Sequence, residues 1–182
     1  MYKRKIGLAI LLIITAIGFY FTYAFYRVFF SPNTSFNNAT SYVFIATDGS
    51  VNALMEDLAP LLDSPEDFRV AAQKKGYLDR IRGGKYAIKK GMNNNEIINS
   101  LRVSSLPVVV TFNNQERLVN LAGRISTQIE ADSLSLIEQF LDTAFLNENG
   151  FTPETALAMY LPNSYQFFWN TSAKDFQQRM LK

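Results

Sequence analysis

The sequence lacks cysteine and histidine altogether. Their absence excludes disulfides, zinc sites built from sulfur or nitrogen ligands, and every cysteine or histidine nucleophile or base. Any chemistry must therefore come from aspartate, glutamate, lysine, tyrosine, serine or threonine. We expect no metal and no cofactor.

Acidic residues are absent before Asp48, whereas the basic residues 3–5 precede an uncharged apolar run over residues 6–26. A helix of ~20 such residues, rising about 1.5 Å per residue, crosses a hydrocarbon core of about 30 Å. The positive-inside rule then predicts a single-pass protein of the cell (inner) membrane. Residues 1–5 are cytoplasmic, residues 6–28 form the transmembrane helix, and the bulk lies in the extracytoplasmic or periplasmic space.

A cleaved signal peptide is the alternative to this anchor, but it has a shorter apolar core and a small-x-small cleavage site. Here the apolar run is longer, and phenylalanine, tyrosine and arginine crowd its exit. These features favour an uncleaved anchor.

Basic charge is scarce outside the N-terminal segment. The chain has 18 lysines and arginines, four of which precede residue 31, and 16 acidic residues, all after residue 47. The exported part therefore has a net charge of about −2, whereas nucleic-acid-binding proteins show a basic excess. We expect no nucleic-acid partner.

Two folded units are predicted beyond a polar linker over residues 29–41. Residues 42–105 form the first unit, a β-α-α-β arrangement followed by a helix. Its strands cover residues 42–45 and 85–88, and its first two helices begin after Ser50 and Ser64.

The second unit, residues 106–182, opens with the β-branched strand LPVVVTF over residues 106–112. Helices are predicted from Arg117, from Asp132 up to a break near Asn147, briefly from Thr152, and from Thr171 or Ser172. The last helix turns Ala173, Phe176 and Met180 to one side, and the sequence supplies no evident partner for that face. The fold class is α+β, with a second domain that we expect to be incomplete.

Glycan chemistry needs a carboxyl group whose pKa is raised by burial, so that it can protonate a glycosidic oxygen. Glu130, Glu138, Glu148 and Glu154 are candidates by residue type only. Each stands in a helical or loop setting typical of solvated acids. We therefore predict none of them to be catalytic.

An aromatic cluster near the C-terminus allows two interpretations. Tyrosine and tryptophan rings stack on sugar rings, and the nearby Asn163 and Ser164 offer short polar groups, but packing into a core is the commoner fate of such aromatics. The cluster consists of Tyr160, Tyr165, Phe167, Phe168 and Trp169.

Three segments carry a resemblance to a known family: GGKYAIKKGMNNNEIINSL (83–101), LPVVVTFNNQERL (106–118) and YLPNSYQFFWNTSAKDF (160–176). The chain resembles the MltG (YceG-like) endolytic murein transglycosylases. In that family the first segment closes a LysM-like module, the second opens the catalytic domain, and the third matches an L-x-P-[DN]-[TS]-Y-x-F motif. The resemblance thus makes residues 42–105 a LysM-like module and residues 106–182 the N-terminal part of a YceG-like domain.

The resemblance implies a peptidoglycan lytic transglycosylase. Such an enzyme cleaves bonds between N-acetylmuramic acid (MurNAc) and N-acetylglucosamine (GlcNAc) in nascent glycan strands. It leaves 1,6-anhydro-MurNAc ends and limits strand length in cell wall biogenesis. Glycan strands, the membrane and peptidoglycan synthases are the implied partners.

The family's catalytic glutamate lies downstream, in an A-S-I-[VI]-E-type helix that this chain does not contain. No catalytic residue is therefore assigned, and the chain is expected to be inactive. The resemblance places Asn163, Ser164 and Tyr165 near the glycan cleft as substrate-binding residues. The alternative function is a non-enzymatic, membrane-tethered glycan-binding or cell-wall scaffold module.

Overall fold

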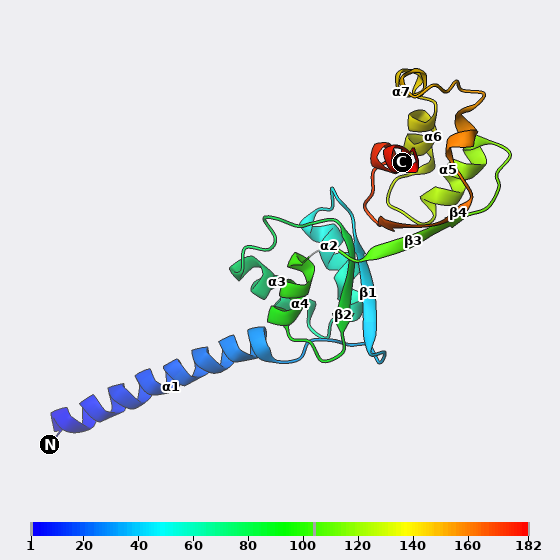
Figure 1. Cartoon of the computed structure of the whole chain (residues 1–182). Helices are drawn as coiled ribbons and strands as arrows, with labels where there is room; N and C mark the ends of the chain where they lie inside the picture. Colours follow the sequence, from blue (N-terminus) through cyan, green and yellow to red (C-terminus); the bar gives the residue numbers. More distant parts are fainter. Residues whose placement is uncertain (1, 104, 182) are drawn as a thin grey trace. The chain divides into compact units, whose positions relative to one another are not determined.

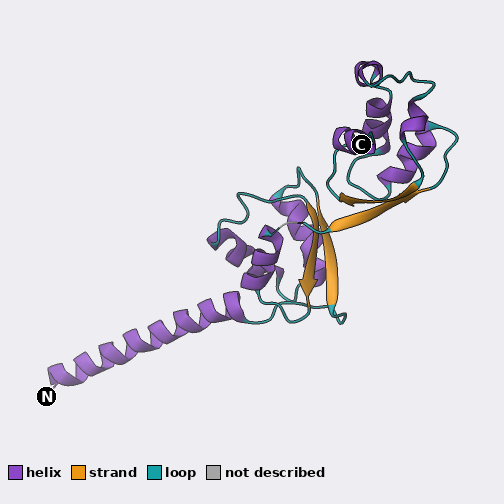
Figure 2. Ribbon diagram, viewed as in Figure 1, coloured by secondary structure: helices purple, strands orange, loops and turns teal. Residues whose placement is uncertain are grey.

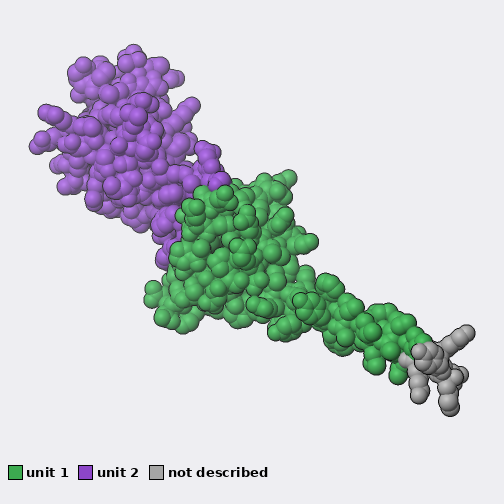
Figure 3. All heavy atoms as spheres, turned by 180° about the vertical axis from the view of Figure 1, so that it is seen from behind, with its two compact units in different colours: residues 1–41, 51–81, 88–103 green, residues 42–50, 82–87, 104–182 purple. Residues whose placement is uncertain are grey.

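The computed structural model describes residues 2–103 and 105–181, with side chains from Ile6 onward. The side chains of the predicted cytoplasmic residues 1–5 lie outside this description. The backbone combines helices with short strands (Figure 1, Figure 2), which confirms the α+β class. The chain divides into two compact units (Figure 3). Unit 1 comprises residues 1–41, 51–81 and 88–103, and unit 2 comprises residues 42–50, 82–87 and 104–182.

Helix α1 (Tyr2–Phe30) begins unit 1. Its residues Ile6–Phe30 are long and apolar enough to cross a membrane, as the sequence predicted. Most apolar side chains around the helix are exposed, and Phe29 in its last turn is buried. The hydroxyls of Thr15 and Thr22 donate to carbonyl oxygens four residues earlier, at 2.8 and 2.9 Å. Both polar groups are thereby satisfied within the helix, as hydrocarbon surroundings require.

The residues directly after α1 are bound to unit 1 by a buried amide network. Asn33 is only 4% exposed. Its Nδ2 donates to the Ser64 carbonyl at 2.9 Å and to Asn94 Oδ1 at 2.7 Å, while its Oδ1 accepts from the Ser64 backbone N–H at 2.6 Å. Asn94 Nδ2 in turn donates to the carbonyl of Val28, in the last turn of α1, at 2.7 Å. The exit of the apolar helix is therefore fixed to the folded unit.

Replacing Asn33 with alanine is expected to lower the opening free energy of unit 1 by about 2 kcal/mol, because buried partners on Ser64 and Asn94 lose their hydrogen bonds. Amide hydrogen exchange in unit 1 measures this free energy separately from unit 2. The exposed Asn38 provides the matched control, Asn38→Ala. Equal protection in both variants would contradict the network's role.

Unit 1 also contains α2 (Val51–Leu58), the 3₁₀ turn η1 (Ala59–Leu61), α3 (Pro65–Lys74) and α4 (Asn94–Arg102). The helix starts agree with the predictions. Ser64 caps α3 by accepting from the Asp67 N–H at 3.3 Å, and Asn93 forms a capping box with Glu96 on α4. The fully buried side chains of these helices include Leu54, Leu58, Phe68, Ala71, Ala72, Ile97, Ile98 and Leu101.

Strands β1 (Thr40–Ile45) and β2 (Gly84–Lys89) form a two-stranded sheet, most of which belongs to unit 2. Strands β3 (Pro107–Phe112) and β4 (Asn163–Phe168) form a second, antiparallel sheet. The sequence predicted β1, β2 and β3 but gave no secondary structure to residues 163–168. Pairing along the whole of β3 makes them a strand, although Pro162, Asn163 and Ser164 begin the segment like a turn.

Helices α5 (Leu118–Ser126), α6 (Ser133–Phe140), α7 (Thr143–Glu148) and α8 (Ala173–Met180) complete unit 2, with the 3₁₀ helix η2 (Ala156–Met159). The single helix predicted from Asp132 to about Asn147 is wrong. It ends at Phe140, and Asp142 caps a new helix by accepting from the Ala144 N–H at 3.0 Å. Residues 153–155 form a turn, so the brief helix predicted from Thr152 begins later, at η2.

One continuous core holds unit 2 together. It combines Val110, Phe112 and Phe167 from one face of the β3–β4 sheet with buried side chains of α5, α6 and α8. Figure 1 shows these helices on the same side of the sheet. Phe176 of α8 is fully buried, and its ring centroid lies 4.8 Å from that of Phe167. The expectation that the apolar face of the last helix lacks a partner is therefore wrong.

Candidate functional site

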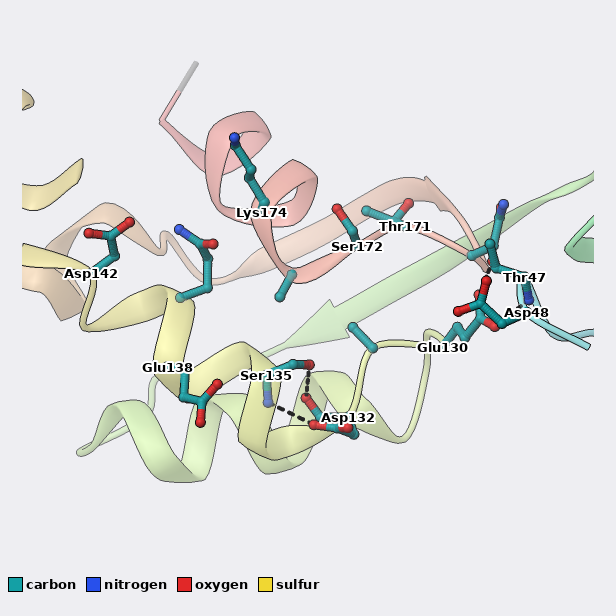
Figure 4. A pocket seen from close by; sticks show the side chains of 14 residues that line it. Thr47, Asp48, Glu130, Asp132, Ser135, Glu138, Asp142, Thr171, Ser172 and Lys174 are labelled. Carbon is teal, nitrogen blue, oxygen red and sulfur yellow. Dashed lines mark hydrogen bonds between the residues drawn. The ribbon is translucent and has the colours of Figure 1, made fainter. Parts of the chain in front are cut away.

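An open polar groove of about 780 Å³ lies in unit 2 (Figure 4). Its walls come from four segments: the turn after β1, the loop between α5 and α6, the exposed side of α6, and the start of α8. The lining residues are Thr47, Asp48, Glu130, Ala131, Asp132, Ser135, Glu138, Gln139, Asp142, Asn170, Thr171, Ser172, Ala173 and Lys174. Most of these residues carry a hydroxyl, amide or carboxyl group, so the groove offers many hydrogen-bonding groups to a polar ligand.

Glu130, in the loop between α5 and α6, connects the turn after β1 with the segment after β4 at one end of the groove. Its two carboxylate oxygens accept from the backbone N–H of Thr47 at 2.6 Å and from the Thr47 hydroxyl at 2.5 Å. Its own N–H donates to the carbonyl of Trp169 at 2.7 Å. A Cβ on Gly83 would lie 2.6 Å from the Cα of Thr47, so only glycine permits this approach. The turn after β1 is thus held in a fixed position.

Replacing Glu130 with glutamine is expected to lower the opening free energy of unit 2 by about 1 kcal/mol. The neutral amide loses the charge-assisted bonds to Thr47, and partial exposure of the site limits the loss. Amide exchange of α5 and α6 measures the change. Glu148→Gln, at an exposed glutamate of the same unit, is the control. A loss of equal size in the control would contradict a specific role for Glu130.

Several acids of unit 2 serve as hydrogen-bond acceptors for nearby helix or turn groups. The Ser135 N–H donates to Asp132 Oδ1 at 2.7 Å at the start of α6 (Figure 4). This bond and others from the same turn lower the pKa of the Asp132 carboxyl. A hydrogen bond from Thr152 likewise lowers the pKa of Glu154. Both shifts favour the ionised form, whereas protonation of a glycosidic oxygen needs a raised pKa. Within the described residues, no group of acids has the arrangement of a metal site.

Strand alternation separates the three residues that the sequence nominated for substrate binding. In the β3–β4 register, Tyr165 pairs with Val110 on the core face, whereas Ser164 pairs with Thr111 on the opposite face. The hydroxyls of Ser164 and Thr111 are 2.8 Å apart. The Tyr165 hydroxyl donates to the Leu161 carbonyl at 2.7 Å. Asn163, at the start of the strand, shares the core-face orientation of Tyr165 but is exposed.

These three residues are not among the described residues that line the groove. A smaller hollow of about 220 Å³ ends at Pro162, beside Asn163, and includes the loop residues 113–115. The groove itself was missed by sequence reasoning. Its lining residues are common polar types that come from widely separated segments, and only folding brings them together.

The C-terminal aromatic cluster divides between the two interpretations left open by the sequence. Tyr160 and Phe167 are core residues, each 5% exposed, and burial raises the pKa of the Tyr160 hydroxyl. Phe168 is 52% exposed, and Trp169 is partly exposed beside Phe44. Tyr165 is half-buried and packs against the same core. Core packing therefore explains three members of the cluster, and surface contacts remain available to Phe168 and Trp169.

The fold and the groove define an α+β protein with an N-terminal helix that is able to span a membrane and an open polar groove in its second unit. The chain belongs to the YceG-like family, whose model matches residues 43–182. Among solved structures, a YceG-like protein from Listeria monocytogenes is similar, with 15% sequence identity and a TM-score of 0.41. The match covers 80% of this chain and 54% of that one, so this chain spans about half the length of that relative. No curated protein matches the sequence.

Proposed function

We propose that this chain is the membrane-proximal part of an endolytic peptidoglycan lytic transglycosylase, with MurNAc–GlcNAc bonds of nascent strands as its substrate. The family match over residues 43–182 is the observation that carries the proposal. The polar groove of unit 2 supports it, because hydroxyl, amide and carboxylate groups in an open channel suit an extended, highly hydroxylated polymer.

The reaction needs one carboxyl group acting twice. As an acid it protonates the glycosidic oxygen, and the GlcNAc leaving group departs. As a base it then takes the proton of the MurNAc 6-hydroxyl, whose oxygen bonds to C1 and closes the 1,6-anhydro ring without water. This differs from the carboxylate pair of most glycosidases. By the family resemblance, a glutamate outside these 182 residues supplies this group.

The residues of this chain would bind and orient the strand. Asn163, Ser164 and Tyr165 are proposed substrate-binding residues by resemblance, and residues 42–105 are a proposed LysM-like module. Because Tyr165 already donates its hydroxyl to Leu161, we assign its contact with substrate to the ring and not to the hydroxyl.

The N-terminal helix would place this activity at the outer surface of the cell membrane, with residues 1–5 in the cytoplasm. The bond from Asn94 to Val28 supports this arrangement, since it fixes the end of α1 to unit 1. New glycan strands emerge at that surface, and peptidoglycan synthases are the proposed neighbours.

The codons that follow Lys182 in the gene test the enzymatic part of the proposal. We expect an in-frame A-S-I-x-E helix within ~60 codons, about the length of one small domain. A stop codon directly after Lys182 would contradict it and favour the alternative, a membrane-tethered glycan-binding or scaffold module without catalysis.

A further inference from the structure

Unit 2 carries a strip of aromatic surface outside the groove. The strip consists of Tyr42 and Phe44 on β1, Lys85 on β2, and Trp169 after β4. Alternation along β1 buries Val43 and Ile45 and leaves Tyr42 and Phe44 53% and 42% exposed. Contiguous exposed apolar surface is typical of interaction sites and ligand-binding grooves.

Contacts within the strip hold its rings in place. The ring centroids of Phe44 and Trp169 are 5.3 Å apart with an interplanar angle of 58°, so the two rings form a tilted pair. The Lys85 ammonium lies 4.5 Å from the Tyr42 ring centroid and 5.8 Å from that of Phe44. Tyr42 therefore positions a cationic donor beside the Phe44–Trp169 pair through a cation–π contact.

We propose that this strip is a binding subsite for N-acetylhexosamine rings of a β-1,4-linked glycan. The apolar C–H face of a pyranose ring stacks on Phe44 and Trp169. The Lys85 ammonium donates a hydrogen bond to a hydroxyl or acetamido oxygen at the ring's edge. Preformed aromatic faces with a polar donor at their border suit a ligand that has one apolar face and a hydroxylated rim.

The path of the chain favours a polymer as the ligand. Trp169 is followed directly by Asn170 and Thr171, which line the groove, and β1 leads from Phe44 to Thr47 in the same wall. The Glu130 N–H donates to the Trp169 carbonyl, which ties the strip to that end of the groove. A strand stacked on the strip would therefore continue into a channel of hydroxyl, amide and carboxyl groups.

The only tryptophan of the sequence lies in the strip and reports binding directly. The full chain in detergent micelles is titrated with a soluble GlcNAc hexasaccharide while Trp169 emission is recorded. We expect a saturable blue shift, because a stacked sugar removes water from the indole. Phe44→Ala should weaken binding about tenfold, the effect of about 1.4 kcal/mol of lost stacking. Phe44→Tyr keeps a ring face and should bind like the wild type.

Leu134→Ala is the matched control, since Leu134 is an apolar residue of the same unit, 64% exposed on α6. Circular dichroism melting checks that each variant is folded. If Phe44→Ala fails to fold, Lys85→Met decides the matter, with a several-fold loss of affinity expected. An unaltered Trp169 spectrum, or wild-type affinity in both Phe44→Ala and Lys85→Met, overturns the proposal. A blue shift that appears without glycan when the protein concentration is raised also overturns the proposal. Such a shift would mean that the strip binds a second copy of the chain.

The choice of glycan rests on the proposed function, but the two fail separately. The titration needs no cleavage, so binding without 1,6-anhydro products would leave the subsite standing while the transglycosylase proposal fails. Conversely, 1,6-anhydro products together with unchanged binding in Phe44→Ala and Lys85→Met would support the transglycosylase proposal and contradict the subsite.

Discussion

Replacing Phe176 with alanine is expected to lower the opening free energy of unit 2 by about 3–5 kcal/mol, the usual cost of truncating a fully buried phenylalanine. The Phe176 ring lies 4.8 Å from Phe167, 6.1 Å from Phe140 and 6.4 Å from Tyr160, measured between centroids. Its removal leaves a cavity where α8, α6 and β4 meet. Domains are stable by only about 5–15 kcal/mol, so this loss would leave unit 2 close to unfolding under physiological conditions.

Amide exchange of α6 and the β3–β4 sheet measures this loss. The exposed Gln178, two residues further along the same helix, gives the control variant Gln178→Ala. A loss below about 1 kcal/mol in Phe176→Ala, as for an average substitution, would show that α8 is not part of the cooperative core.

Replacing Gly84 with alanine is expected to cost about 3 kcal/mol or more, for two separate reasons. Gly84 has φ +141°, a conformation that L-residues rarely adopt, and a Cβ there would lie 2.4 Å from the Cβ of Ser105. Backbone strain accounts for about 1–3 kcal/mol, and displacement of Ser105 adds to it. Thermal melting and amide exchange of unit 2 measure the effect.

Two further variants separate these causes. Gly150→Ala, in the same unit, places a Cβ in open space at φ +78°, so it measures strain without a clash. Adding Ser105→Gly to Gly84→Ala removes the clash but leaves the strain. A double variant as unstable as Gly84→Ala alone would contradict the steric part of the explanation.

Local signals in the sequence were sufficient to predict the helices of unit 1 and the strands that contain β-branched residues. Ser64 is followed by Pro65 and two acids, a pattern typical of a helix start, and the Ser64 hydroxyl oxygen caps α3 by accepting from the Asp67 N–H. The apolar spacing of Ile97, Ile98 and Leu101 is likewise typical of one helix face, and all three are buried in α4.

Long-range contacts decided the features that the sequence did not predict. β4 becomes a strand because β3 offers a complete set of backbone partners, and α8 loses its exposed face because Phe140 and Phe167 meet it. Asp142 can cap a helix or stand inside one. Here its side chain accepts from the Ala144 N–H, so a new helix begins and the longer helix that was expected does not form.

The candidate site shows the same division. Resemblance alone nominated Asn163, Ser164 and Tyr165, and no local rule could indicate that alternation along β4 would turn Ser164 to the other face. Alternation along TSYVFI could have suggested that Tyr42 and Phe44 share an exposed face. Their meeting with Lys85 and Trp169 could not be read from spacing, because it depends on three separate segments.

Mass analysis of peptidoglycan ends tests the central claim most directly. The full-length gene product, purified in detergent, is incubated with uncrosslinked glycan strands, and the new ends are identified by mass spectrometry. A variant with the family's glutamate changed to glutamine is the control. We predict new 1,6-anhydro-MurNAc ends, lighter by one water molecule than hydrolysed ends, with none from the variant. Hydrolysed ends, or no new ends from a folded full-length protein, would contradict the proposal that this chain belongs to a lytic transglycosylase.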